Sequence, residues 1–228
     1  MDRWQRIWND DGDNRYAPAK IILHAVSLLY LLIIKLRNLL YDHKFFPEVK
    51  LPCPVISVGN ITAGGTGKTP CVIMLAQIVK EMGFKPAVLS RGYGGSNKAP
   101  VNVVSDGSNI LLSGTVAGDE PSLIARSLQG VPVLIGPQRS LTGRAAIDKF
   151  GVDMIICDDA FQHRRIFRDI NLLLLDGRKP FGNGYLLPRG ELREPLRELR
   201  RADAFILTRN DEAGGTDSIS GKFKNTAV

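Results

Sequence analysis

Short runs of branched apolar residues alternate with stretches of helical spacing between residues 54 and 208. The runs are almost continuously apolar, which is typical of strands in a sheet that is covered on both faces. This pattern predicts strands at 54–58, 86–90, 131–135, 152–157, 170–175 and 204–208, and an edge strand at 101–104. Between them, apolar residues at helical spacing predict helices at 70–82, 120–128 and 139–150.

The regular succession of strand and helix is the signature of βαβ units, whose strands lie parallel. We therefore expect an α/β fold with a mainly parallel sheet flanked by helices. The tail from Asn210 is polar and rich in glycine, so we expect a linker there or the start of a further domain. The chain accordingly divides into an N-terminal segment at 1–50, a core at 51–209 and a tail at 210–228.

Residues 21–34 are uncharged and mostly apolar, and the charged residues Lys35 and Arg37 then interrupt the run. These 14 residues fall short of the ~20 that a membrane-spanning helix needs. Acidic residues before the run and the lack of a small-residue cleavage site after it argue against a signal peptide. Two interpretations stay open: a helix packed inside the protein, or an amphipathic helix lying on a membrane surface. The second interpretation places the neighbouring basic residues near anionic head groups (Lys20, Lys35, Arg37 and Lys44).

A glycine-rich loop at 59–70 joins the first predicted strand of the core to its first helix. Glycines let backbone N–H groups approach phosphates, and the N-terminus of the following helix adds positive potential. Lys68 is placed to reach the β- and γ-phosphates, and the Thr69 hydroxyl to bind Mg²⁺. Thr62 stands where the strict GxxxxGK[ST] pattern has glycine, so this is a variant P-loop. It predicts a nucleotide-phosphate site formed by Gly64, Gly65, Thr66, Gly67, Lys68 and Thr69.

Paired carboxylates follow the predicted strand at 152–157. Asp158 and Asp159 have the position of a Walker B acid, which holds Mg²⁺ or one of its waters near the P-loop. ATP is favoured over GTP because the chain has no NKxD sequence, and the TRND at 208–211 is only a faint echo of one. Ala63 stands where partitioning-type ATPases carry a lysine, which argues against that class.

The composition is that of a folded globular protein: 228 residues, of which 44% are hydrophobic and 23% charged. The net charge of +7 arises mostly at 160–201, which contains ten lysines and arginines but only five acidic residues. Such an excess favours an anionic partner, either a phosphorylated substrate or an acidic membrane surface. The chain has no RNP motif, zinc finger or aromatic-interleaved basic run, so a nucleic-acid partner is not expected. The three cysteines lack CxxC spacing, which favours a reducing compartment.

Further motifs follow in a distinctive order: SRGYG at 90–94, GDEP at 118–121, DDAFQHR at 158–164, FGNG at 181–184 and LPRGELREP at 187–195. Over residues 17–209 this set resembles the tetraacyldisaccharide 4′-kinase family, with Ala160 where the family usually has glycine. The resemblance implies a P-loop kinase that uses ATP and Mg²⁺ to phosphorylate the 4′-hydroxyl of a tetraacyl glucosamine disaccharide 1-phosphate in lipid A biosynthesis. It also implies a peripheral, monotopic location at the cytoplasmic face of the bacterial inner membrane, and a second domain that is incomplete in this chain.

The resemblance assigns roles to individual residues. Asp119 is the residue that accepts the hydroxyl proton, with a histidine partner that no histidine of this chain matches. A plain helix cap is the alternative for Asp119, because aspartate caps helices well. Glu194 is assigned to the Mg²⁺ site together with Thr69, Asp158 and Asp159, with an ordinary acid at a helix entry as its alternative.

Five further residues make up the predicted substrate-binding set. Arg139 and Arg193 are proposed phosphate contacts, for which a solvated surface arginine is the alternative. Arg91 and Tyr93 are expected to contact the acceptor sugar. His163 is expected to orient groups near the metal acids, or to be a structural histidine.

Two other functions stay open beside the kinase: a membrane-associated fragment that binds ATP without transferring phosphate, and a P-loop NTPase switch or metallochaperone. The sequence predicts no oligomeric state.

Overall fold

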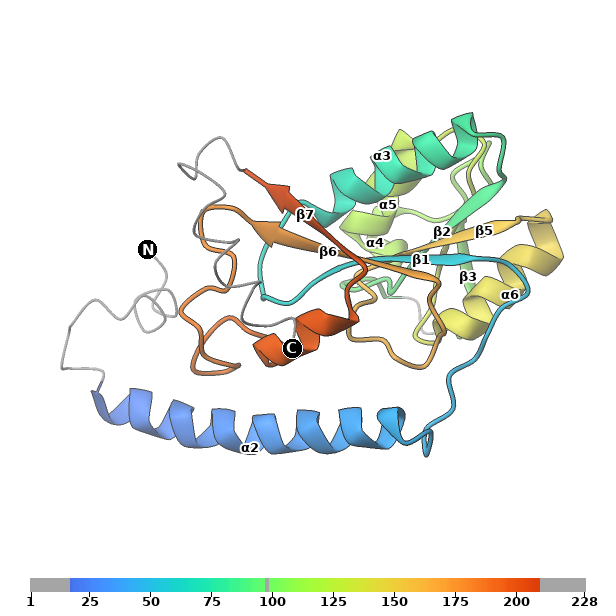
Figure 1. Ribbon diagram of the computed structural model, residues 1–228. Coiled ribbons are helices and arrows are strands. Elements are labelled where there is room, and N and C mark those ends of the chain that lie inside the picture. Colours follow the sequence, from blue (N-terminus) through green and yellow to red (C-terminus); the bar gives the residue numbers. More distant parts are fainter. Residues whose placement is uncertain (1–16, 97–98, 210–228) are drawn as a thin grey trace. The chain divides into compact units, whose positions relative to one another are not determined.

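The computed structural model describes residues 17–96 and 99–209, and its strands follow the predicted order (Figure 1). All seven predicted strands form, each within two residues of its predicted bounds. They are β1 (Val55–Asn60), β2 (Pro86–Ser90), β3 (Asn102–Ser105), β4 (Val133–Ile135), β5 (Met154–Asp158), β6 (Ile170–Asp176) and β7 (Ala204–Thr208).

The three helices predicted for the core also form, and two short ones appear that were not predicted. The former are α3 (Lys68–Glu81), α5 (Asp119–Ser127) and α6 (Arg139–Phe150), and the latter are α4 (Gly114–Ala117) and the 3₁₀ helix η2 (Leu196–Arg201). A long N-terminal helix, α2 (Ala17–Asp42), precedes the sheet.

The sheet has seven strands in the order β3-β4-β2-β5-β1-β6-β7. Parallel pairing joins β1 to β5, β5 to β2, and β2 to β4. The edge strand β3 runs antiparallel to β4. The expected α/β fold with a mainly parallel sheet is therefore confirmed, and so is the edge position of the strand predicted at 101–104.

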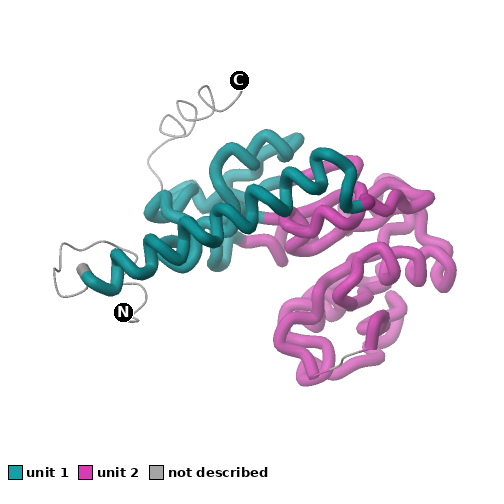
Figure 2. Tube along the Cα trace, turned by 90° about the horizontal axis from the view of Figure 1, so that it is seen from below, with its two compact units in different colours: residues 1–46, 60–66, 173–228 teal, residues 47–59, 67–172 magenta. Residues whose placement is uncertain are grey.

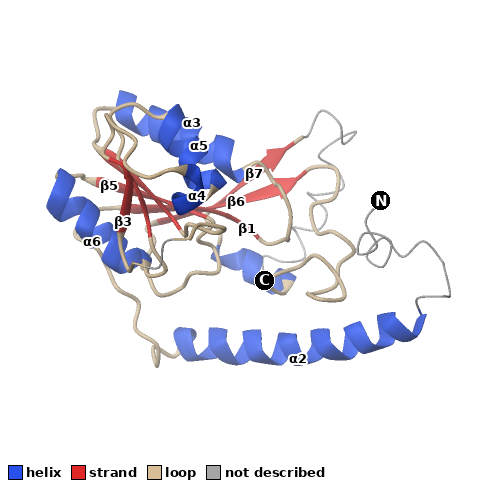
Figure 3. Ribbon diagram, turned by 180° about the vertical axis from the view of Figure 1, so that it is seen from behind, coloured by secondary structure: helices blue, strands red, loops and turns tan. Residues whose placement is uncertain are grey.

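Helices cover both faces of the part of the sheet formed by β1 to β5. Helices α3, α4 and α5 lie on one face and α6 on the other (Figures 1 and 3). All residues of β1, β2 and β4 are consequently buried, which explains their continuously apolar sequences. A core cluster lies on one side of these strands: Leu51, Val55, Ala87, Leu89, Leu134, Ala146, Val152, Ile155, Cys157, Ala160 and Ile166.

The chain forms two compact units (Figure 2). Unit 1 contains residues 1–46, 60–66 and 173–228, and unit 2 contains residues 47–59 and 67–172. Residues 60–66 of the glycine-rich loop thus belong to unit 1, and its first residue and its end at 67–70 belong to unit 2. The division at 1–50, 51–209 and 210–228 stays a prediction, and its tail lies outside the described residues.

Helix α2 is longer than the apolar run from which it was inferred. The helix continues past Lys35 and Arg37 to Asp42, for 26 residues in total. The expectation that this segment is too short to cross a membrane is therefore wrong, because Pro18–Asp42 is long and apolar enough by length and composition alone.

One stripe of α2 is nevertheless buried within unit 1. Ser27, Ile34 and Asn38 lie on this stripe at helical spacing and are nearly inaccessible to solvent. Large apolar side chains occupy the exposed remainder of the helix: Ile21, Ile22, Val26, Leu28, Leu29, Leu32, Ile33, Leu36 and Leu39.

Candidate active site

The glycine-rich loop has the backbone geometry that its sequence predicts. Gly64 and Gly67 have φ angles of 124° and 79°, which residues with a Cβ atom rarely adopt. A Cβ atom added to Gly64 or to Gly65 would point into open space, so the loop leaves room beside its backbone. Within residues 17–96 and 99–209, no side chain caps the N-terminus of α3, which starts directly after Gly67. The loop and the helix start therefore suit an anion such as a nucleotide phosphate.

Within unit 1, the end of β7 holds two carbonyl groups of this loop. Thr208 Oγ1 donates to the Thr66 carbonyl over 3.1 Å, and Arg209 Nη1 donates to the Gly65 carbonyl over 2.9 Å. Arg209 also pairs with Asp176, whose pKa is lowered to about 2 by the hydrogen bond from Arg178 and then by that from Arg209. These bonds hold the carbonyl groups of Thr66 and Gly65 within unit 1.

The roles of Thr208 and Arg209 were missed by sequence reasoning. The TRND at 208–211 was considered only as an echo of a guanine motif, and no local pattern links β7 to a loop more than 140 residues earlier.

A cavity of about 310 Å³ lies beside residues 62–66 of this loop within unit 1. Its lining consists of Thr62, Ala63, Gly64, Gly65, Thr66, Asp176, Arg178, Lys179 and Glu191.

Within unit 2, Lys68 and the paired acids lie close together. Lys68 Nζ is 3.6 Å from Asp159 Oδ1. Asp158 ends β5 in a buried position and accepts a 3.0 Å hydrogen bond from Ser90 Oγ. Burial raises the pKa of the Asp158 carboxyl to about 6, although the bond from Ser90 opposes this rise.

The groups in this region fit a magnesium ion. Asp158 Oδ1 is buried and has no hydrogen-bond partner among the described residues, and Thr69 adds a half-buried hydroxyl at the first turn of α3. Oxygen atoms of these two kinds are the ligands that Mg²⁺ prefers. In the described part of the chain no three His, Cys, Asp or Glu side chains form a metal-binding group. A site with few protein ligands is typical of Mg²⁺ that is bound together with a nucleotide.

Arg139 and His163 both lie near the end of β5. Arg139 is buried and donates to the carbonyls of Gly136 and Asp158 over 2.8 and 3.2 Å, so the alternative of a solvated surface arginine is wrong. Burial lowers the pKa of His163 to about 4, and Arg139 adds to this shift. The neutral ring of His163 has a buried Nε2 atom with no hydrogen-bond partner in the part of the chain that the structure describes.

The loops that carry the predicted acceptor residues pack against each other in unit 2. Asp119 is the first residue of α5 and is exposed, and the N-cap position belongs to Gly118. The alternative that Asp119 caps the helix is therefore wrong. A Cβ atom on Gly118 would clash with the carbonyl of Tyr93, so glycine is what allows the two loops to approach so closely. Tyr93 and Arg91 are both exposed beside this contact.

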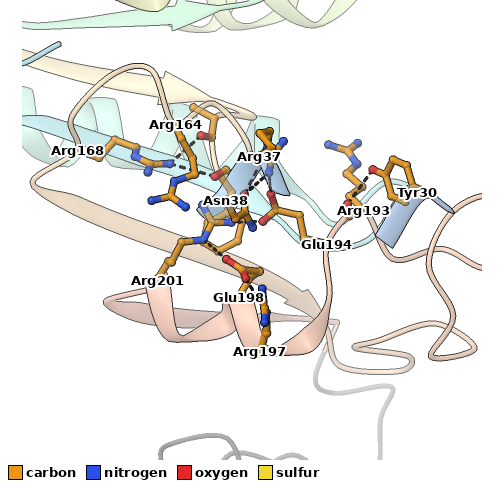
Figure 4. Close-up of polar contacts among 12 residues, drawn as sticks. Tyr30, Arg37, Asn38, Arg164, Arg168, Arg193, Glu194, Arg197, Glu198 and Arg201 are labelled. Carbon is orange, nitrogen blue, oxygen red and sulfur yellow. Dashed lines mark hydrogen bonds and ion pairs between the residues drawn. The ribbon is translucent and has the colours of Figure 1, made fainter. Parts of the chain in front are cut away.

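Arg193 and Glu194 lie in unit 1, where Glu194 belongs to a cluster of charged side chains and Arg193 lies beside Tyr30 (Figure 4). Glu194 has no exposed surface, and its two carboxylate oxygens pair with Arg37 of α2 and with Arg201 of η2. Burial raises the pKa of Glu194, while the two guanidinium groups oppose that rise. The alternative of an ordinary acid at a helix entry does not describe so deeply buried a group. A metal-binding role for Glu194 stays a prediction.

The predicted site residues thus fall into two sets, one in each unit. Unit 2 contains Gly67, Lys68, Thr69, Arg91, Tyr93, Asp119, Arg139, Asp158, Asp159 and His163. Unit 1 contains Gly64, Gly65, Thr66, Arg193 and Glu194.

A family model described as tetraacyldisaccharide-1-P 4′-kinase matches residues 19–227 of this chain. The chain belongs to that family. The tetraacyldisaccharide 4′-kinases of Syntrophus aciditrophicus and Desulfatibacillum aliphaticivorans are 56% and 46% identical to it, over 96% and 95% of its length. The family resemblance seen in the sequence is therefore confirmed.

A solved structure adds a match in three dimensions. The crystal structure of LpxK from Aquifex aeolicus in complex with ATP is similar with a TM-score of 0.80 and 44% identity, over 86% of this chain. This chain spans 61% of the Aquifex protein and 61% and 59% of the two relatives.

Proposed function

We propose that this chain carries the ATP-binding and phosphoryl-transfer site of a tetraacyldisaccharide 4′-kinase. The reaction moves the γ-phosphate of ATP to the 4′-hydroxyl of a tetraacyl glucosamine disaccharide 1-phosphate, a precursor of lipid A. The observation that carries this proposal is a loop with P-loop geometry in a chain that belongs to this family. The similarity to LpxK in complex with ATP supports ATP as the phosphate donor.

Positioning and charge stabilisation provide most of the catalysis in phosphoryl transfer. The loop backbone and the Lys68 ammonium hold the β- and γ-phosphates in this proposal. The ion pair with Asp159 keeps the Lys68 side chain in place at the start of α3. Asp158 and Thr69 are the residues that hold Mg²⁺, which when bound neutralises charge on the phosphate oxygens.

The acceptor hydroxyl needs a group that takes its proton. Asp119 is exposed at the first turn of α5, beside the loop of Arg91 and Tyr93, so an incoming sugar can reach it. Arg139 and His163 add a guanidinium and a neutral imidazole near the end of β5.

The acceptor is a lipid, and α2 has the surface that a lipid interface requires. Large apolar side chains are exposed along the helix, while the stripe of Ser27, Ile34 and Asn38 is buried in unit 1. A helix that crosses a bilayer alone would leave this polar stripe in hydrocarbon, which is costly. We therefore propose that α2 lies on the cytoplasmic face of the inner membrane as a peripheral, monotopic element that contacts anionic lipid.

Transfer of labelled γ-phosphate from ATP to the disaccharide 1-phosphate in detergent micelles tests the proposal. The unchanged chain is expected to label the lipid, and Lys68→Ala to reduce this by at least about a hundredfold, as is typical when a group that stabilises the transition state is removed. Lys149→Ala, which changes an exposed lysine of α6, is the matched control and should transfer normally.

Three outcomes contradict the proposal in different ways. Binding of ATP without transfer by the unchanged chain favours the ATP-binding fragment. Steady hydrolysis that ignores the acceptor lipid favours an NTPase switch or metallochaperone. Normal transfer by Lys68→Ala removes the assignment of the phosphate loop.

A further inference from the structure

The buried stripe of α2 contacts the segment that contains Arg193 and Glu194. Ser27 Oγ donates to the Leu186 carbonyl over 2.9 Å and accepts a 3.0 Å bond from the Arg189 amide. Tyr30 donates its hydroxyl to the Arg193 carbonyl over 2.8 Å. The partners are about 160 residues apart in sequence, so these bonds fix the helix to the segment rather than stabilising a local turn.

A chain of ion pairs extends this contact (Figure 4). Arg37 donates to Asn38 Oδ1 and pairs with one oxygen of Glu194, while Arg201 pairs with the other. Glu198 is also buried and pairs with Arg201 and Arg197 over 3.0 and 3.1 Å. A carboxylate as buried as Glu194 stays ionised only where cations compensate for its lost hydration, and one of its two cations comes from α2.

The same segment is bonded to the start of the phosphate loop. The Arg193 amide donates to the Ile61 carbonyl over 2.8 Å, and the Ala63 amide donates to the Glu191 carbonyl over 2.6 Å. Thr62 and Leu192 form an antiparallel bridge between these two bonds. The 191–194 segment therefore lies between α2 and the loop, with hydrogen bonds to both.

We propose that Tyr30 and Arg37 are positioning residues, through which α2 sets the place of Arg193 and Glu194 beside the phosphate loop. This proposal rests on the proposed function for what Arg193 and Glu194 do, and it adds a second role to α2. The exposed side of the helix faces the lipid, and the buried stripe holds the catalytic segment. An enzyme whose acceptor is a lipid thereby connects its contact with the interface to its reacting groups.

Two substitutions separate positioning from folding. Arg37→Met keeps the apolar part of the side chain and removes the cation beside Glu194. Tyr30→Phe removes only the hydroxyl that bonds to the Arg193 carbonyl. Arg37→Lys keeps a positive charge at this position, so its effects on exchange and on kcat are expected to be smaller than those of Arg37→Met. Arg144→Met, on the exposed side of α6, controls for loss of an arginine elsewhere.

Amide hydrogen exchange and kinetics are measured on the same proteins. In Arg37→Met, exchange in residues 186–201 is expected to be faster by about tenfold or more, because a buried charge has lost its partner. In Tyr30→Phe the expected change is about threefold, as for loss of one neutral hydrogen bond. Strand β2 in unit 2 should exchange as before. The kcat for transfer should fall in the same order, while the Kd for ATP and binding to vesicles of anionic phospholipid stay within about twofold.

Unchanged exchange at 186–201 in both Tyr30→Phe and Arg37→Met overturns the proposal, and so does an equal effect of Arg144→Met. A uniform loss of protection that includes β2 shows general destabilisation and also overturns it. If Arg37→Met does not fold, exchange at 186–201 in Tyr30→Phe and Arg37→Lys decides whether the proposal holds. The exchange measurement needs no transfer, so a chain that fails to phosphorylate the lipid contradicts the proposed function while this test still gives its own result.

Discussion

Replacement of Thr208 by valine is expected to weaken ATP binding while leaving the size and shape of the side chain nearly unchanged. The substitution removes the 3.1 Å hydrogen bond to the Thr66 carbonyl and a 3.4 Å contact with the Leu175 carbonyl. A neutral hydrogen bond in a protein stabilises it by about 1 kcal/mol net. Since 1.4 kcal/mol corresponds to tenfold in an equilibrium constant, the Kd for ATP should rise by about fivefold if this bond orders the loop for the nucleotide.

Calorimetric titration with ATP and urea unfolding together provide the assay. Thr115→Val, at an exposed position of α4, serves as the control for a threonine-to-valine change and should bind ATP normally. A lower free energy of unfolding with an unchanged Kd for ATP would refute the reasoning. That result would mean that the bond from Thr208 supports the fold equally with and without nucleotide, and that it does not order the loop.

Three further predictions follow from the site. Asp119→Asn should leave the Kd for ATP within about twofold and slow transfer by roughly 10²–10⁴, the range for loss of a general base; an unchanged rate in single-turnover assays excludes that role. Asp158→Asn should abolish Mg²⁺-dependent transfer yet stabilise the fold at pH 7. The pKa of this carboxyl rises to about 6 on folding, so its contribution to the free energy of unfolding is fully present below about pH 4. The wild-type protein loses this contribution, at most about 3 kcal/mol, as the pH rises through 6. Urea unfolding at pH 4 and 7 should therefore show a more stable variant only at pH 7. His163→Gln should raise the stability of the fold relative to wild type on the acidic side instead. The pKa of His163 falls to about 4 on folding, so wild-type stability declines from pH 6.5 toward 4, and the variant should lose less of it in thermal unfolding over this window.

The sheet was predictable because burial on both faces leaves a direct mark on sequence. Strands β1, β2 and β4 are buried throughout, and their short, continuously apolar sequences are typical of such strands. The elements that were missed carry no such mark. Helix α4 has four residues, too few for a period, and η2 has the sequence LRELRR, whose two leucines are too few to show one. Its Glu198 is buried through ion pairs, which hydrophobic patterning does not register.

The extent of α2 was misjudged for a similar reason. Charged residues at positions 35 and 37 were taken to end the apolar segment, but Arg37 points to a buried carboxylate within unit 1. A charged residue need not end a helix: Lys35 stays exposed within α2, and the partner of Arg37 is 157 residues away in the sequence. The roles of Thr208 and Arg209 lay beyond sequence reasoning on the same ground, since they act through backbone carbonyls that any residue has.

Motif reasoning was most successful where one short segment contains all the chemistry. The phosphate loop needed its glycines at fixed positions, and Gly64 and Gly67 have positive φ angles that favour glycine. Phosphate binding by the loop stays a prediction. The acid pair likewise lies at the end of β5, where Asp158 is the last residue of the strand and Asp159 follows it. Burial could not be deduced in the same way. Arg139 was left with a solvated alternative, and only the structure places it under the end of β5.

Product analysis tests the central claim most directly. The chain is incubated with ATP, Mg²⁺ and the tetraacyl disaccharide 1-phosphate, and ³¹P NMR of the lipid and ADP formation are recorded together. The account predicts a new phosphomonoester at the 4′ position, formed in equal amount to ADP and absent with Lys68→Ala. ADP that forms at the same rate without the lipid, or bound ATP with no new phosphomonoester, would contradict it.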